Sequence, residues 1–170
     1  MSLCDREEHQ WRQWVDDTLV HLIAPNIYRS PVEAYSSLAY FRQALGENSM
    51  EHVPKEDDSR RFIQFLSSPV TQSLCRHHIE GNEREALHKA LAHWSRAVGK
   101  SRSYMGGTSP NLSDLAVFGV LNSIEGCQAF KEVVAKNMEL KSWYQRMQDL
   151  VENQAGLYSL PQTFHKKTPN

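Results

Sequence analysis

Along most of the chain, apolar residues recur at steps of three and four, which is the spacing of one face of an α-helix. The first such stretch predicts a helix over residues 7–23 that ends at Pro25 and Asn26. One face of this helix carries Trp11, Trp14, Val15, Thr18, Leu19, Leu22 and Ile23. Runs of β-branched residues with a period of two are absent, so the pattern predicts no sheet.

A second helix is predicted to begin at Ser30 and to end at Gly46. Ser30 suits the N-cap, Pro31 suits the first helical position, and Glu33 stands where it would complete a capping box. Glycine is the residue most often found just beyond the last turn of a helix. The apolar stripe between these two ends supports the assignment.

Two further helices begin at equally suitable caps. Asn82 with Glu85 opens a helix that we expect to end at Gly99. Asn111 with Asp114 opens the next one, and this pair is the most structured local signal in the sequence. We expect Asn111 and Asp114 to form a scaffold without taking part in chemistry.

The remaining segments are also predicted to be helical, except for the C-terminus. Residues 60–78 form a third helical region interrupted at Pro69, and shorter helices are expected over 128–135 and 140–151. Prolines in residues 154–170 predict an irregular tail. The sequence therefore predicts an all-α fold of six or seven helices, with residues 1–170 in a single domain.

Charge and composition exclude several functional classes. The 170-residue chain has a net charge of -1 and a pI of about 6.7, which gives no long-range field to attract nucleic acid. No apolar run approaches the length of a membrane span, and no secretory signal is evident. The first three residues look like a cloning remnant, so we expect the chain to be a piece of a longer protein.

Spacing of the reactive side chains predicts no catalytic residue and no metal site. The three cysteines, Cys4, Cys75 and Cys127, are odd in number and widely spaced, which favours a reducing compartment over a disulfide framework. His88 and His93 are five residues apart and so diverge on a helix. No nucleophile elbow or phosphate-binding loop is present.

A small basic cluster is formed by Arg76, His77 and His78 at a predicted helix end. One interpretation is a favourable interaction with the terminal carbonyl groups of that helix. The other is an anion-binding patch for a carboxylate ligand, for which Arg76 and His78 are the candidate ligand-binding residues.

Three stretches of the sequence resemble a known family. They are WRQWVDDTLVHLIAPNIYRSPVEA (residues 11–34), NEREALHKALAHW (82–94) and YMGGTSPNLSDLAVFGVL (104–121). Together they resemble the C-terminal helical half of the membrane-associated prostaglandin E synthase type 2 family, in the glutathione transferase superfamily. The resemblance implies a glutathione transferase C-terminal-like helical bundle.

In that family a thioredoxin-like N-terminal half carries a Cys-x-x-Cys and a tyrosine that isomerise prostaglandin H2 to prostaglandin E2. The sequence of this chain contains neither motif, so the resemblance implies that catalysis belongs to the parent protein and not to this chain alone. It also implies a thioredoxin-like partner half, a homodimer, and a mitochondrial or cytoplasmic location.

The resemblance further implies two basic residues, four apart on a helix, that hold carboxylates of glutathione or haem. Gln72 and Arg76 stand at those positions here. One guanidinium keeps one bidentate site but loses the clamp, which argues against haem. Glutathione is expected to bind only through the parent protein.

A second interpretation makes the chain a non-catalytic protein-interaction module of the same helical type. The two interpretations differ in whether a thioredoxin-like segment with Cys-x-x-Cys is encoded upstream of Cys4. If that half is absent from the chain, part of the surface of the first helix has lost its cover. We therefore expect an exposed apolar patch on the side of Trp11 and Trp14.

Overall fold

The computed structural model describes residues 3–46, 64, 67–69 and 83–157, and these residues form an all-α bundle, as the sequence predicts. Within this part of the chain the extended pairing is limited to one isolated bridge between Tyr104 and Gly107. The elements are α1 (Leu3–Trp14), the π-helical segment η1 (Val15–Leu19), α2 (Val20–Ile27), α3 (Pro31–Leu45), α6 (Glu83–Val98), α7 (Leu112–Ser123), α8 (Gln128–Lys136) and α9 (Met138–Leu157).

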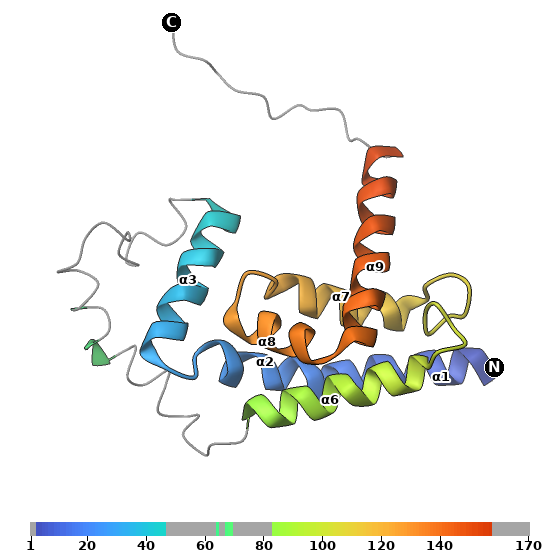
Figure 1. Cartoon of the computed structure of the whole chain (residues 1–170), viewed down its shortest axis with the longest axis horizontal. Coiled ribbons are helices and arrows are strands. Elements are labelled where there is room, and N and C mark those ends of the chain that lie inside the picture. The colour runs from blue at the N-terminus through green and yellow to red at the C-terminus, as the bar shows by residue number, and fades with distance from the viewer. Residues whose placement is uncertain (1–2, 47–63, 65–66, 70–82, 158–170) are drawn as a thin grey trace, which may run out of the picture.

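The helices α1, η1 and α2 form one nearly continuous rod that runs beside α6 along the base of the molecule (Figure 1). Helices α7 and α8 lie over this pair, and α8 leads directly into α9. Both α3 and the C-terminal part of α9 project from the same side of the bundle, at some distance from each other (Figure 1). None of the helices in the described ranges is both long enough and apolar enough to cross a membrane.

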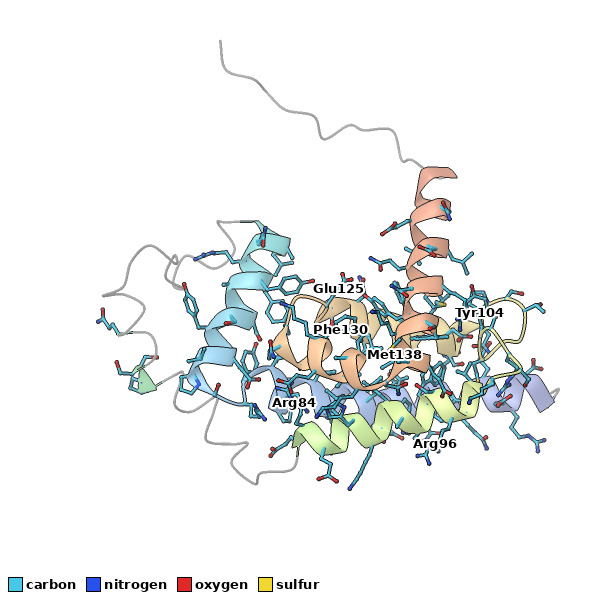
Figure 2. All side chains as sticks on the ribbon, viewed as in Figure 1. Arg84, Arg96, Tyr104, Glu125, Phe130 and Met138 are labelled. Atoms are coloured by element: carbon cyan, nitrogen blue, oxygen red, sulfur yellow. The ribbon has the colours of Figure 1, made fainter. Side chains whose placement is uncertain are left out.

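The core lies where α6, α7 and α9 meet, and α1, η1 and α8 close it. Its largest side chain without solvent exposure is Trp94, in the third turn of α6. Figure 2 shows Phe130 of α8 inside the bundle and Arg84 where α6 passes α2. The other large apolar side chains that are fully buried among the described residues are Leu19, Leu87, Leu91, Met105, Leu121, Ile124, Leu140, Met147, Val117 and Val133.

The predicted end of the first helix at Pro25 and Asn26 is wrong, because the helical path continues to Ile27. Proline removes one backbone hydrogen bond, yet tertiary contacts hold this turn in place. The buried Asn26 side chain donates from Nδ2 to the carbonyl oxygens of Leu22 (2.7 Å) and Glu83 (3.0 Å). The second of these bonds ties α2 to the start of α6.

Helix α3 begins at the predicted cap, since Ser30 Oγ accepts a hydrogen bond from the Glu33 backbone N–H at 3.2 Å. The Glu33 carboxylate does not complete the expected capping box. It forms ion pairs with Arg29 Nη2 at 2.8 Å and Arg84 Nη2 at 2.6 Å. Charged donors outcompete the backbone N–H here because charge-assisted bonds are the stronger ones. Gly46 follows the last residue of α3, with a φ of 95°.

The later helices end where the sequence predicts, except for α9 at its C-terminal end. Gly99 ends α6 with a φ of 71°, where glycine carries no steric penalty. Helix α9 extends well beyond the predicted 140–151, so residues 154–157 are helical and not part of an irregular tail. The Asn82 cap, residues 158–170 and most of the region predicted over 60–78 lie outside the described residues.

Two glycines allow opposite predictions for the same substitution. At Gly126 a Cβ would overlap the ring of Tyr40, so Gly126→Ala should destabilise the protein by about 1–3 kcal/mol through overpacking. Gly119 lies inside α7 with open space around it, so Gly119→Ala should stabilise by roughly 0.5–1 kcal/mol. Urea unfolding of both variants tests this pair, and shifts of the same sign would contradict it.

Candidate functional site

The carboxylate of Asp114 is the most heavily hydrogen-bonded buried group described in the protein. Asp114 has no solvent exposure, and its Oδ1 accepts from Met105 N (2.9 Å) and Trp143 Nε1 (3.0 Å). Its Oδ2 accepts from Gly106 N (3.1 Å) and Asn111 N (3.0 Å). One side chain therefore joins the loop before α7, the start of α7 and the second turn of α9.

Asn111 provides the other half of the capping box. Its Oδ1 accepts from Ser113 N at 3.0 Å and from Asp114 N at 3.2 Å, while Asp114 accepts from Asn111 N. These bonds satisfy amide groups that would otherwise lack partners at the first turn of α7. The pair thus forms the capping box that the sequence predicts, and the bonds of Asp114 hold the start of α7 against the preceding loop and α9.

A second buried residue with a polar network, Arg84, lies in the first turn of α6. Arg84 is 8% exposed, and its Nη2 donates to the Asn26 carbonyl at 3.1 Å as well as to Glu33. Its Nη1 lies 3.3 Å from Glu132 Oε2, an ion pair that lacks hydrogen-bond geometry. The guanidinium thus ties α2, α3, α6 and α8 together, and buried charges need such pairing.

Titratable groups near this network do not form a reactive centre. Burial, followed by the positive charges of Lys136 and Arg84, lowers the pKa of His88 and favours its neutral form. Burial raises the pKa of the Cys127 thiol, whose residue is 1% exposed, so it is protonated and inaccessible at neutral pH. Across the described residues, no cluster of three or more histidine, cysteine or acidic side chains could hold a metal ion.

The candidate ligand-binding residues Arg76 and His78, together with Gln72, lie outside the described residues. Their proposed contact with an anion therefore stays a prediction. The same holds for the thiol of Cys75.

Trp11 and Trp14 are partly buried and do not form the exposed patch expected from the sequence. The Trp11 ring packs edge-on against Trp94, with ring centroids 5.2 Å apart, and lies 5.1 Å from the ring of His93. The two neighbouring indoles also contact each other at 5.1 Å. They extend the core outward along α1.

Large apolar side chains are exposed on several other helices, and two neighbouring ones lie on α7, the helix capped by Asn111. Leu112 is 51% exposed and Leu115 is 47% exposed, although the opposite face of α7 carries core residues. The sequence pattern could not separate these two leucines from core positions, because apolar residues surround α7 on nearly every side.

An apolar groove continues from Leu115 toward α9. It has a volume of about 220 Å³ and is lined mainly by Tyr104, Pro110, Leu115, Leu150 and Val151. Val151, on α9, is 42% exposed. This groove and the two exposed leucines form one candidate docking surface for another molecule or domain. We call this surface the α7 face.

No family model matches the chain, whereas several curated proteins do, among them two that match most of it. Prostaglandin E synthase 2 of Mus musculus is 40% identical over 146 residues, which are 86% of this chain and 37% of that protein. Prostaglandin E synthase 2 of Danio rerio is 38% identical over 148 residues, which are 87% of this chain and 38% of that protein. The chain thus spans little more than a third of the length of these relatives.

The matches extend over most of the chain, and they agree with the family resemblance stated from residues 11–34, 82–94 and 104–121. The all-α bundle is also the fold which that resemblance implies. The chain is therefore similar to the prostaglandin E synthase 2 proteins over most of its own length, and its described residues have the all-α fold class that the resemblance implies.

Proposed function

We propose that this chain is the helical half of a prostaglandin E synthase 2-like protein and forms one wall of a ligand cleft. The observation that carries the proposal is the α7 face, with two half-exposed leucines beside an apolar groove. Large apolar side chains grouped in this way mark surfaces that another element covers. Because the matched relatives are much longer than the chain, a second domain is the cover that we propose.

The free energy of burying apolar surface favours the docking of a second domain on the α7 face. Full burial of a leucine side chain is worth about 1.5–3 kcal/mol, and Leu112 and Leu115 have roughly half of that gain still to make. Clefts between domains are common ligand sites, and an apolar wall suits the hydrocarbon part of a ligand. Tyr104, Leu150 and Val151 would provide that wall beside the docked domain.

In the whole protein we propose the isomerisation of prostaglandin H2 to prostaglandin E2, which is the reaction that the family resemblance implies. The reacting groups would belong to the thioredoxin-like half, and the helical half would bind and shield the substrate. Arg76 and His78 remain the proposed contacts for a carboxylate of glutathione. A homodimer belongs to the same proposal, and sedimentation of the whole protein tests it.

The direct test compares the product of the complete coding sequence with the 170-residue chain. We expect the complete product to form prostaglandin E2 from prostaglandin H2 faster than a heat-inactivated control, and the chain alone to match that control. A complete product no faster than its inactivated control would contradict the proposed reaction.

The second candidate function, a non-catalytic interaction module, is supported by the same α7 face, because a protein partner could also cover it. The coding sequence upstream of Cys4 separates the two candidates. A thioredoxin-like segment with Cys-x-x-Cys supports the enzyme, and a different domain there supports the module.

A further inference from the structure

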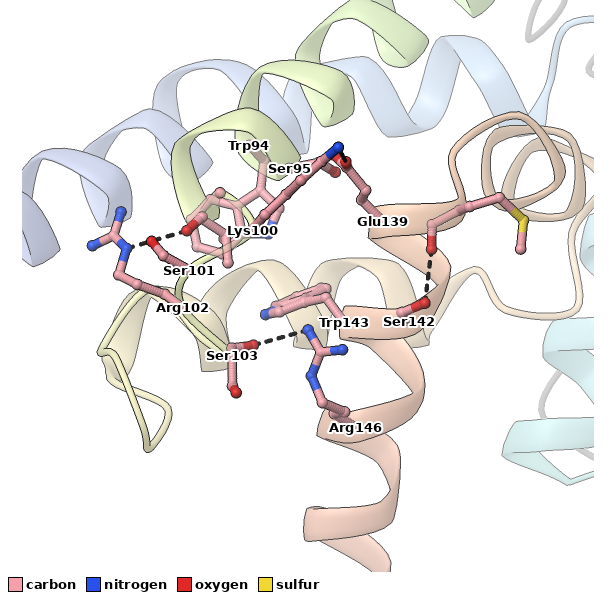
Figure 3. Close-up of a pocket in the computed structure, with 13 residues that line it drawn as sticks. Trp94, Ser95, Lys100, Ser101, Arg102, Ser103, Glu139, Ser142, Trp143 and Arg146 are labelled. Atoms are coloured by element: carbon pink, nitrogen blue, oxygen red, sulfur yellow. Dashed lines mark hydrogen bonds and ion pairs between the residues drawn. The ribbon is translucent and has the colours of Figure 1, made fainter.

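A second cavity, separate from the α7 face, opens at the other side of the loop before α7. It has a volume of about 430 Å³, within the range of roughly 300–1,000 Å³ that is typical of small-molecule sites. The end of α6, residues 99–103 and the first turns of α9 enclose it (Figure 3). In Figure 3 the side chains of Trp94, Trp143 and Arg146 surround the same hollow.

The charged side chains that line this cavity carry more positive than negative charge. Arg102 is committed to the structure, since its guanidinium pairs with Glu7 at 3.2 Å and donates to backbone carbonyls. Lys100 Nζ lies 3.6 Å from Glu139 Oε1, and both side chains are largely exposed. Arg146 forms no ion pair with a carboxylate of the described residues, and its Nη2 donates to the Ser103 carbonyl at 3.0 Å. One cation is therefore left without a counter-charge.

Two N–H groups in the cavity wall also lack an acceptor among the described residues. Trp94 is fully buried and its Nε1 has no hydrogen-bond partner, and the same is true of Arg146 Nε. Buried N–H groups are nearly always paired, so two unpaired donors on one cavity need an explanation. The neighbouring indole of Trp143 differs, because its Nε1 donates to Asp114.

The remaining wall is apolar and aromatic. The rings of Trp94 and Trp143 have centroids 5.5 Å apart and meet at 72°, and Val98 and Met138 stand beside them. Such a surface suits a flat hydrocarbon group. The Arg146 guanidinium, which donates to the Ser103 carbonyl and lies 5.9 Å from the centroid of the Tyr104 ring but has no carboxylate partner among the described residues, suits an oxyanion.

We propose that this cavity binds a small organic oxyanion, a carboxylate on a flat apolar body. Arg146 binds the carboxylate with help from Lys100, and the body lies in the part of the cavity lined by Met138, Trp94 and Trp143. This site uses no residue of the α7 face and does not depend on the proposed synthase function.

The test uses the indole N–H signals of the ¹⁵N-labelled chain, whose four tryptophans give four assignable peaks. Titration with benzoate should shift the Trp94 signal and leave that of Trp14 unchanged. Benzamide has the same shape without the charge, and acetate has the charge without the ring, so both should bind about tenfold more weakly. Equal shifts with benzamide, or no shift of Trp94 at millimolar benzoate, would overturn the proposal.

Two variants test the assigned cations. Arg146→Gln should weaken benzoate binding about tenfold, whereas Arg96→Gln, an exposed position on α6 outside the cavity, should leave it unchanged. Lys100→Gln is the second cavity variant. Because the Lys100 side chain is 88% exposed, this substitution should leave the fold intact, and it should weaken benzoate binding about threefold. Unaltered affinity in both cavity variants would overturn the assignment.

Discussion

Replacement of Asp114 by alanine is expected to lower the free energy of unfolding by about 3–5 kcal/mol, because several buried N–H donors lose their acceptor at once. The substitution leaves three backbone N–H groups and the Trp143 indole N–H without their acceptor in a buried site. Urea unfolding followed by far-ultraviolet circular dichroism measures the loss.

Asn111→Ala is the matched control, because it removes the other half of the same capping box. Asn111 caps only the first turn of α7, so this variant should cost about 1 kcal/mol, within the usual range of 0.5–2 kcal/mol for a lost N-cap. A loss in Asp114→Ala no greater than that in Asn111→Ala would show that the long-range contacts of the carboxylate contribute little.

Arg84→Met is expected to destabilise the protein by about 3 kcal/mol. Methionine keeps most of the volume of the arginine stem but leaves Glu33 and the Asn26 carbonyl without their buried partner. Chemical unfolding of the variant measures the effect.

Arg29→Met provides the control for this network, since Arg29 pairs with the same carboxylate from a side chain that is 45% exposed. Exposed pairs contribute about 0–1 kcal/mol, so this variant should remain close to the parent chain. Equal effects of the two substitutions would contradict a special role for the buried guanidinium.

The sequence predicted the helices and their caps because these depend on residues three or four positions apart. Asn111 and Asp114, or Ser30 with the N–H of Glu33, need no distant partner to form a cap. The contact between Asp114 and Trp143 spans 29 positions and depends on how α9 packs. No local pattern could have revealed it.

The errors have the same physical origin. Pro25 is a sound local stop signal, yet the contact of Asn26 with Glu83, 57 positions away, keeps the turn helical. Trp11 and Trp14 were expected at an open surface, whereas His93 and Trp94 of α6 cover part of their rings.

Exposed leucines on α7 could not be predicted either, because Leu112 and Leu115 stand among apolar residues that do reach the core. Their exposure depends on which face of α7 turns toward α1 and η1. Only the packed structure determines that rotation.

Thiol labelling at Leu115→Cys tests the central claim, that the rest of the protein covers the α7 face. Cys4 and Cys75 are first changed to serine, and Val32→Cys, at a 59% exposed position on α3, is the control. We predict rapid labelling of both sites in the 170-residue chain, and strong protection of Leu115→Cys alone in the product of the complete coding sequence. Equally rapid labelling of Leu115→Cys in both proteins would contradict the account.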